Sequence, residues 1–415
     1  MNSNKIIPII GLLIVMILAV GFASASDVDS ESVGESASID FGKAIDDSNI
    51  IEEEQAIDAA ADEETGSDSY AIDDSKTEAG VQNSLGSSQD EDVLASTVRF
   101  KENQYSTYFN GSGNIISGKL KAGDTLDFSG TFTNKIFIIN IPLTITCTDG
   151  TVLLKNCGFN FVSGSSGSNI SNIKAKQISV AQRPVFQAQG VNNLTFINND
   201  IFSNQTQSYP MTFNNIAGFK IFYNKLQCNA YADSTGYSQP SAMVFRNAGN
   251  CNISSNTVIT NDSYGIAFSG YGASSSMGFN PEDGSYENYI FNNTIHSIRE
   301  LPSSYHIAIY LMCKDNIVKN NTIYNAYRAI YATSSGNQII GNTIHNIHGA
   351  YYSQATSEQG SDFAIHAASN STIKDNLIYD CNFNNGGIRG AIFVGNDSNV
   401  SGNTILNCNG SGIII

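Results

Sequence analysis

The sequence has no tryptophan, only seven prolines and five histidines, and just 14% of its 415 residues are charged. Its seven cysteines include no C-x-x-C pair, so a dense disulfide framework is not indicated. Only 21 residues are basic against 38 acidic ones, so nothing in the composition recommends binding to nucleic acid. What remains is an Asn-, Ser-, Gly- and Ile-rich chain whose order must come from repetition.

The negative charge is concentrated before residue 96. Residues 26–95 contain 21 acidic residues and two lysines, a net charge of −19, whereas residues 96–415 contain 17 acidic and 18 basic residues, a net charge of +1. The acidic segment has almost no aromatic residues and cannot bury enough apolar surface to offset the entropy of ordering. We therefore expect residues 26–95 to form a disordered, acidic, Ser-rich spacer.

The first 25 residues have the pattern of a secretory signal peptide. Lys5 precedes an apolar run over residues 6–22, and Ala23, Ser24 and Ala25 form a small-residue cleavage site. The alternative is an uncleaved membrane anchor, although a run of 17 residues is at the short limit for spanning a bilayer. In either case the bulk of the protein is expected outside the cytoplasm. If the signal peptide is cleaved, no membrane insertion is expected for the rest of the chain.

A short frame of apolar residues and asparagine recurs along the chain. Residues 316–323, NIVKNNTI, return 21 residues later as NQIIGNTI. Alternation around the Asn predicts two short strands joined at a corner, and spacings of 21 to 37 residues indicate loops inserted into one solenoid unit. The eight frame asparagines are Asn199, Asn224, Asn256, Asn293, Asn321, Asn342, Asn376 and Asn403.

Packing explains why the corner carries asparagine. A sharp bend needs a residue that tolerates left-handed backbone angles, and after Gly it is Asn that adopts them at least cost. Stacked coils would then bring the side-chain amides together in a hydrogen-bonded ladder. The Ile, Val or Leu two residues later is expected to point inward and stack on its counterparts.

A third apolar stretch completes each repeat, for example at residues 211–213, 309–311, 330–332 and 392–394. Three short strands per turn predict an all-β fold, a right-handed parallel β-helix. A leucine-rich repeat is the alternative, but Leu is scarce at the frame positions and no repeat contains a helical segment.

The β-rich segments divide the folded region into two parts. Residues 96–152 are expected to form an N-terminal cap and the first coils, because turn-forming residues at 121–128 precede a β-rich run at 136–145. Residues 153–415 are expected to form the β-helix repeats. They end inside an apolar strand without a cap, which predicts further C-terminal domains or a capping chain.

Several features of the sequence occur together in one family of surface proteins. They are the signal peptide, the acidic spacer, the segment GDTLDFSGTF at 123–132 and the corners NNTI, GNTI and DNLI. With them the sequence resembles archaeal, especially methanogen, adhesin-like surface proteins with β-helix repeats, and more distantly the pectate-lyase-like superfamily. The resemblance covers roughly residues 96–415. It implies the fold and says little about activity, because the shared motif residues are structural.

Aligned third strands place four rings at one outward position on successive coils, where they could contact sugar rings. The alternative is ordinary packing beneath the loops at 298–308, 347–362 and 382–389. The residues predicted to bind a glycan are Tyr310, Tyr331, His366, Phe393, Tyr327, Arg328 and Arg389.

An enzyme is an alternative, because pectin lyases and polygalacturonases share the predicted fold. Their chemistry needs paired carboxylates, or a Ca²⁺ site with an Arg or Lys base. The candidate acids do not recur at matched positions on neighbouring coils, so the sequence favours a protein that is not an enzyme. The charged residues weighed for this role are Asp315, Glu358, Asp362, Lys314, Arg328 and Arg389.

No metal site or other cofactor is predicted from the histidines and cysteines. The histidines include no H-x-x-x-H pair, and His345 and His348 are expected to be exposed at a corner. Cys381 and Cys408 each follow a frame Asn by five residues, so they are predicted to stack in the core, with a disulfide between them as the alternative.

Together these features predict an exported, cell-surface or secreted protein of adhesin type that binds a glycan or a neighbouring cell-surface polymer. The alternatives are a secreted polysaccharide lyase or glycoside hydrolase, and a non-catalytic structural stalk of the envelope. The loop at 270–288, with Tyr271, Phe279 and Tyr286, departs most from the frame and is a second candidate contact surface.

Overall fold

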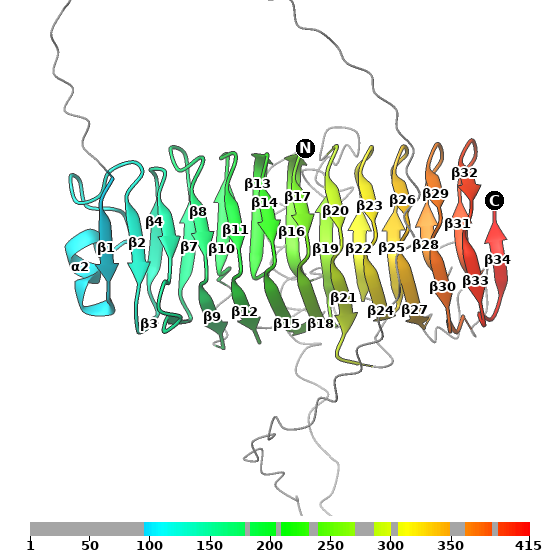
Figure 1. Cartoon of the computed structure of the whole chain (residues 1–415), viewed down its shortest axis with the longest axis horizontal. Coiled ribbons are helices and arrows are strands. Elements are labelled where there is room, and N and C mark those ends of the chain that lie inside the picture. Colours follow the sequence, from blue (N-terminus) through cyan, green and yellow to red (C-terminus); the bar gives the residue numbers. More distant parts are fainter. Residues whose placement is uncertain are drawn as a thin grey trace, which may run out of the picture. The chain divides into compact units, whose positions relative to one another are not determined.

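In the computed structural model, three parallel sheets wind around a common interior (Figure 1). The structure describes residues 95–178, 183–204, 209–231, 240–269, 286–299, 306–348, 362–383 and 389–415. All of them lie in one compact unit, Ser88–Ile415. The other unit, Met1–Ser87, holds the expected signal peptide and most of the expected spacer, and it lies outside the described residues.

Each coil contributes one strand to each of three sheets, which we call A, B and C in chain order. Sheet A contains β1 (Thr97–Phe100), β2 (Thr125–Phe128), β5 (Thr144–Thr146), β8 (Asn169–Ser171), β11 (Thr195–Ile197), β14 (Lys220–Phe222), β17 (Asn252–Ser254), β20 (Tyr289–Phe291), β23 (Ile317–Lys319), β26 (Gln338–Ile340), β29 (Thr372–Lys374) and β32 (Asn399–Ser401). Sheet B contains β3 (Thr131–Thr133), β6 (Leu153–Lys155), β9 (Lys174–Gln177), β12 (Asp200–Ser203), β15 (Lys225–Tyr231), β18 (Thr257–Asp262), β21 (Thr294–Ser297), β24 (Thr322–Ala326), β27 (Thr343–Ile347), β30 (Leu377–Tyr379) and β33 (Thr404–Leu406). Sheet C contains β4 (Ile136–Ile139), β7 (Gly158–Phe161), β10 (Phe186–Gln189), β13 (Met211–Ala217), β16 (Ser241–Gly249), β19 (Tyr264–Ser269), β22 (Ile307–Leu311), β25 (Arg328–Ala332), β28 (Asp362–Ala367), β31 (Arg389–Val394) and β34 (Ser411–Ile414).

Neighbouring coils pair in parallel in all three sheets, as in β23 with β26, β24 with β27 and β22 with β25. The order A, B, C repeats without reversal, which confirms the predicted right-handed parallel β-helix. Two short helices, η2 (Glu102–Gln104) and α2 (Tyr105–Tyr108), stand between β1 and β2. Within the described ranges, no helix has the length and apolar character needed to cross a bilayer.

The predicted asparagine ladder is present at the corner between sheets A and B. The Nδ2 of each frame Asn donates to the Oδ1 of the next, over distances of 2.8 to 3.0 Å from Asn199 through Asn403. The same Oδ1 also accepts the backbone N–H of the preceding frame Asn, as between Asn321 and Asn342 at 2.9 Å. Each amide therefore satisfies buried backbone as well as its neighbour, which makes the column part of the core.

The expectation that the frame Asn itself adopts left-handed backbone angles is wrong. The residue in the left-handed region is the one before the frame Asn, for example Asn198 (φ 54°), Asn320 (φ 55°) and Gly341 (φ 64°). No frame Asn has a positive φ. The two positions therefore have different roles. The residue before the frame Asn turns the chain and faces solvent, whereas the frame Asn points inward to reach its ladder partners.

A second ladder, which the sequence reasoning missed, lies at the corner between sheets C and A. Asn288 donates from Nδ2 to Asn316 Oδ1 at 3.0 Å, and Asn316 donates in the same way to Asn337 at 2.9 Å. Each of these residues precedes its frame Asn by five positions, so the spacing N-x-x-x-x-N was the available signal. All three side chains are buried.

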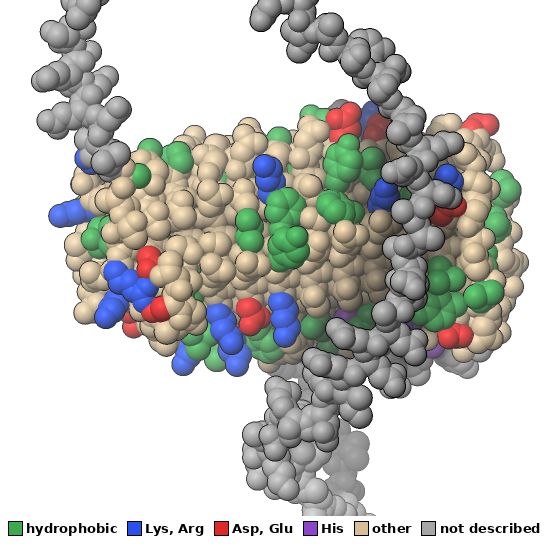
Figure 2. Space-filling model, in the orientation of Figure 1, with side chains coloured by type: hydrophobic (Ala, Val, Ile, Leu, Met, Phe, Trp, Pro, Cys, Tyr) green, Lys and Arg blue, Asp and Glu red, His purple; other side chains and the backbone are tan. Residues whose placement is uncertain are grey.

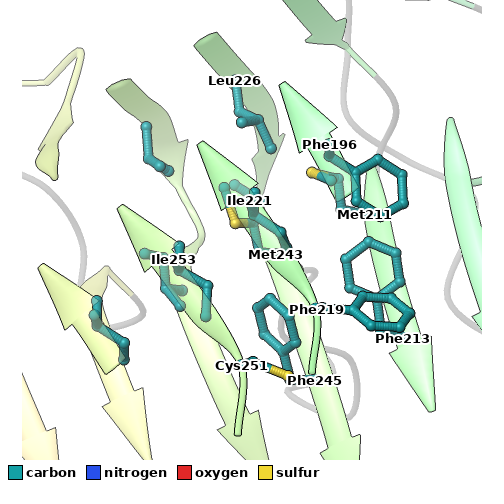
Figure 3. Close-up of a cluster of buried hydrophobic side chains, with 14 of the residues drawn as sticks. Phe196, Met211, Phe213, Phe219, Ile221, Leu226, Met243, Phe245, Cys251 and Ile253 are labelled. Carbon is teal, nitrogen blue, oxygen red and sulfur yellow. The ribbon is translucent and has the colours of Figure 1, made fainter. Parts of the chain in front are cut away.

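The interior changes from aromatic to aliphatic along the helix axis. Phe196, Phe213, Phe219 and Phe245 pack in successive coils around β11 to β16 (Figure 3). After Phe268, which stacks on Phe245 with ring centroids 4.3 Å apart, the inward positions are held mainly by Ile. Of the eight inward frame residues predicted from the sequence, Ile405 is half-buried and the other seven are fully buried, which confirms the alternation on which the frame rests. The seven are Ile201, Leu226, Val258, Ile295, Ile323, Ile344 and Ile378.

The cysteines are free thiols, and all except Cys408 are buried. Burial raises the pKa of Cys251 to about 12 and also raises the pKa of Cys381, so these thiols are poor nucleophiles. We expect an aromatic disulfide reagent to titrate one thiol rapidly in the native protein, and seven after unfolding in denaturant without reductant.

In that titration, Cys408→Ser should remove the rapid phase and leave the slow thiols unchanged. Fewer than seven thiols after unfolding would instead show that the disulfide alternative, between Cys381 and Cys408, is correct.

Candidate functional site

Four of the seven predicted binding residues lie in register on the outer face of sheet C. The strand pairs align Tyr310 with Tyr331, Tyr331 with His366, and His366 with Phe393. Tyr331, His366 and Phe393 are half-buried. The alignment of third strands made from the sequence alone is thus reproduced residue by residue.

The rings contact one another along this column. Tyr310 and Tyr331 stack with centroids 5.5 Å apart and planes 9° apart. His366 meets Tyr331 edge to face at 4.7 Å, and Phe393 is tilted by 44° from His366. The faces of the first two rings therefore cover each other, whereas the tilted rings of His366 and Phe393 also pack against Phe363.

An apolar cluster that the sequence reasoning missed extends this column toward the N-terminus. The cluster consists of four buried residues on strands of sheet C: Val244, Tyr264, Ala267 and Ile307. Three tyrosines pack against it, namely Tyr209, Tyr310 and Tyr331. Tyr264 meets Tyr310 at 5.2 Å. Tyr264 stands three positions before the residue in register with Tyr310, so strand alignment gave no signal for it.

Arg328 and Tyr327 lie beside the column. The Arg328 guanidinium lies over the rings of Tyr331, at 4.5 Å, and of Tyr327, at 5.1 Å. Arg328 and Tyr327 are both buried, and their backbone N–H groups donate to the carbonyl of His306. The structure therefore places the Arg328 guanidinium against the rings of Tyr331 and Tyr327.

Arg389 lies at the start of β31, in register with Asp362. Its Nη1 donates to the Phe383 carbonyl at 2.9 Å, whereas its buried Nε has no hydrogen-bond partner among the described residues. A buried donor without an acceptor costs about 1–3 kcal/mol, and an oxygen atom of a ligand would remove that cost.

Burial sets the protonation of this face. It raises the pKa of Tyr310 to about 12, with Tyr331 adding to the effect. It lowers the pKa of His366 to about 4, and the nearby Arg328 charge lowers it further. At neutral pH the column is therefore uncharged apart from its arginines, and the neutral His366 ring has one donor and one acceptor nitrogen.

Of the charged residues weighed for catalysis, Asp362 and Arg389 are in register on adjacent strands, and Asp315 lies elsewhere. Asp315 lies at the corner after β22, with φ 59°, whereas Asp362 begins β28 at the other edge of sheet C. Glu358 lies outside the described residues, as do Tyr271 and Phe279 of the second candidate surface. Within the described ranges, no three His, Cys, Asp or Glu side chains lie close enough together to hold a metal ion.

A second aromatic column, on the outer face of sheet B, was also missed. His296, Tyr324, His345 and Tyr379 stack with centroid distances of 4.5, 5.1 and 4.8 Å. The expectation that His345 is exposed at a corner is wrong, because the residue lies within β27, half-buried between two tyrosine rings. The signal was present, since each member follows a frame Asn by three residues.

A family model described as a right-handed beta helix region matches residues 278–415. No protein with a curated description matches the sequence significantly. Among solved structures, the Streptococcus pneumoniae surface protein and adhesin PfbA is similar at 12% identity and a TM-score of 0.46, over 76% of this chain and 90% of that one.

Two similar structures are enzymes. The catalytic domain of a GH87 alpha-1,3-glucanase in complex with tetrasaccharides has 13% identity and a TM-score of 0.43, over 71% of this chain and 64% of that one. The polygalacturonase from Erwinia carotovora ssp. carotovora has 10% identity and a TM-score of 0.42, over 77% and 96%.

These matches correct the expectation that the chain is not an enzyme. The similar structures include polysaccharide-degrading enzymes beside an adhesin, so the fold does not distinguish an enzyme from an adhesin. The sequence argument against catalysis was therefore wrong. At 10–13% identity the likeness concerns the fold alone. The described unit is thus a right-handed β-helix protein with two aromatic columns on its outer faces.

Proposed function

We propose that this chain is an exported, surface-associated protein of adhesin type that binds an extracellular glycan or a neighbouring cell-surface polymer along the outer face of sheet C. The observation that carries the proposal is the column from Tyr310 to Phe393, with Arg328 packed on Tyr331. The export signal predicted at residues 1–25 supports an extracellular location.

Two features make this face suited to a sugar polymer. The tilted rings of His366 and Phe393 offer apolar contact to C–H groups, and the Arg389 Nε offers a donor that the protein leaves unused among the described residues. Figure 2 shows one face of the molecule, on which most of the described side chains are neither acidic nor basic.

The test measures binding of the full chain to an array of extracellular glycans. Phe393→Leu combined with Arg389→Gln should weaken binding at least tenfold, because both the ring contact and the donor are lost. Tyr289→Leu is the matched control, since Tyr289 is an exposed aromatic residue on sheet A. Equal binding by the double variant and the control would refute the proposal.

A polysaccharide-degrading enzyme would use the same face, so the second readout is chemical. Each glycan that binds is incubated with the protein, and the release of reducing or unsaturated sugar ends is measured. Binding without release supports the adhesin, whereas release that Phe393→Leu with Arg389→Gln abolishes shows that the column serves an enzyme.

A further inference from the structure

The outer face of sheet B carries one unbroken register column over nine coils. Adjacent strands align Lys155 with Lys176, Lys176 with Phe202, and Tyr324 with His345. At about 4.8 Å per coil, the column spans roughly 38 Å. Its members are Lys155, Lys176, Phe202, Gln227, Ile259, His296, Tyr324, His345 and Tyr379.

The first part of this face is positively charged. On strands β6, β9, β12 and β15, Lys155, Lys174, Lys176 and Lys225 are exposed and Asp200 is the one acidic residue, while Glu102 reaches the neighbouring strand β3 at the Thr133 backbone N–H. The Lys174 to Asp200 contact is 3.8 Å long and exposed, and the other three lysines form no ion pair with a described acidic residue. Residues 96–415 have a net charge of only +1, so this is a local concentration of charge.

The arrangement of the lysines is costly for the protein alone. Lys155 and Lys176 are directly opposed in register, and like charges so placed destabilise a sheet. The Lys176 ammonium lies 5.5 Å from the Phe202 ring centroid, which holds it over the column. An anion lying across the two lysines would remove their repulsion.

The second part of the face presents hydrogen-bond donors. The rings from His296 to Tyr379 stack with planes 8° to 17° apart, so their faces are covered and their edges point outward. Ring edges are electropositive, and the tyrosine hydroxyls and imidazole nitrogens add donors. A parallel row of threonine hydroxyls, at Thr257, Thr294, Thr322 and Thr343, runs beside them.

We propose that the outer face of sheet B binds an acidic polysaccharide that lies along the helix axis, with its acid groups on the lysines and its hydroxyl oxygens on the ring edges and threonines. A linear polymer fits because the column, with lysines at one end and the stacked His and Tyr rings at the other, extends for about 38 Å, farther than a small molecule reaches. This surface is separate from the column on sheet C and does not depend on its function.

The test uses dextran sulfate and uncharged dextran, which share one backbone, as probes of the full chain at two salt concentrations. The wild-type protein should bind dextran sulfate and not dextran, and the affinity should fall with salt because the lysines are exposed. The variant Lys155→Gln/Lys176→Gln/Lys225→Gln should bind at least tenfold more weakly, with a smaller salt dependence.

The matched control is Lys220→Gln/Lys319→Gln/Lys374→Gln, which removes the same charge from exposed positions on sheet A. It should bind nearly as the wild type does. Equal losses in the two triple variants, equal binding of the two dextrans, or no binding of dextran sulfate would each overturn the proposal.

The ring column is tested separately with Tyr324→Leu/Tyr379→Leu. This variant should lose severalfold in affinity for dextran sulfate while its salt dependence stays that of the wild type, because its lysines remain. Unchanged affinity in a folded variant, verified by its far-ultraviolet circular dichroism, would remove the rings from the proposed surface. Phe393→Leu/Arg389→Gln should leave dextran sulfate binding intact, which separates this proposal from the one on sheet C.

Discussion

Replacing Asn321 by Gly is expected to lower the free energy of unfolding by about 3 kcal/mol or more. The Asn321 Nδ2 donates to Asn342 Oδ1 at 3.0 Å and to the Ile290 carbonyl at 2.9 Å, and its Oδ1 accepts the Asn293 backbone N–H at 3.0 Å. Without the side chain, buried groups on both adjacent coils lose their partners. Urea denaturation followed by circular dichroism measures the change.

The matched control is the same substitution one residue earlier. Asn320 is exposed and has φ 55°, a conformation that Gly adopts without strain, so Asn320→Gly should change stability by less than about 1 kcal/mol. Both variants gain the same freedom in the unfolded chain, so their difference isolates the ladder. Equal effects at the two positions would mean that the ladder amides contribute nothing beyond the turn.

Acid is expected to destabilise the protein through His306. This side chain is fully buried, its Nε2 contacts the Thr260 hydroxyl, and its Nδ1 has no hydrogen-bond partner among the described residues. Burial, reinforced by His296, lowers the pKa of His306 from 6.5 to about 3. Between these values the unfolded chain binds a proton that the folded chain excludes, so stability falls as pH falls, by roughly 1 kcal/mol per pH unit.

Stability curves in urea at several pH values between 4.5 and 7 would test this. His306→Gln should flatten the dependence. Some slope should survive in His306→Gln, because burial also lowers the pKa of His366, to about 4. An unchanged slope in His306→Gln would contradict the assignment.

The sequence predicted the architecture because its periodic signal is a packing requirement. The frame asparagines and the Ile, Val or Leu two residues later must recur wherever coils stack, so their register could be read directly. Matching the third strands of successive repeats also predicted the outward alignment of Tyr310, Tyr331, His366 and Phe393.

Other features were harder to read because they depend on contacts between different parts of a coil. The exchange of Phe for Ile along the interior involves residues of all three sheets, which the pattern of one strand does not reveal. The cluster around Tyr264 forms because rings reach across rows. By contrast, the stacked His and Tyr rings on sheet B have a constant spacing from the frame Asn, so this column could have been predicted from the sequence.

The frame amides all point the same way, since one N–H of each Nδ2 donates to the Oδ1 on the later coil and each Oδ1 faces the earlier coil. Their dipoles consequently add, giving the β-helix an electrical polarity comparable in origin to that of an α-helix. Mutual polarisation strengthens such chains by about 10–30% per bond, so an amide in the middle of the row supports more than its own contacts. The same substitution should accordingly be more damaging at Asn293 than at Asn403, where the row has a neighbour on one side among the described coils.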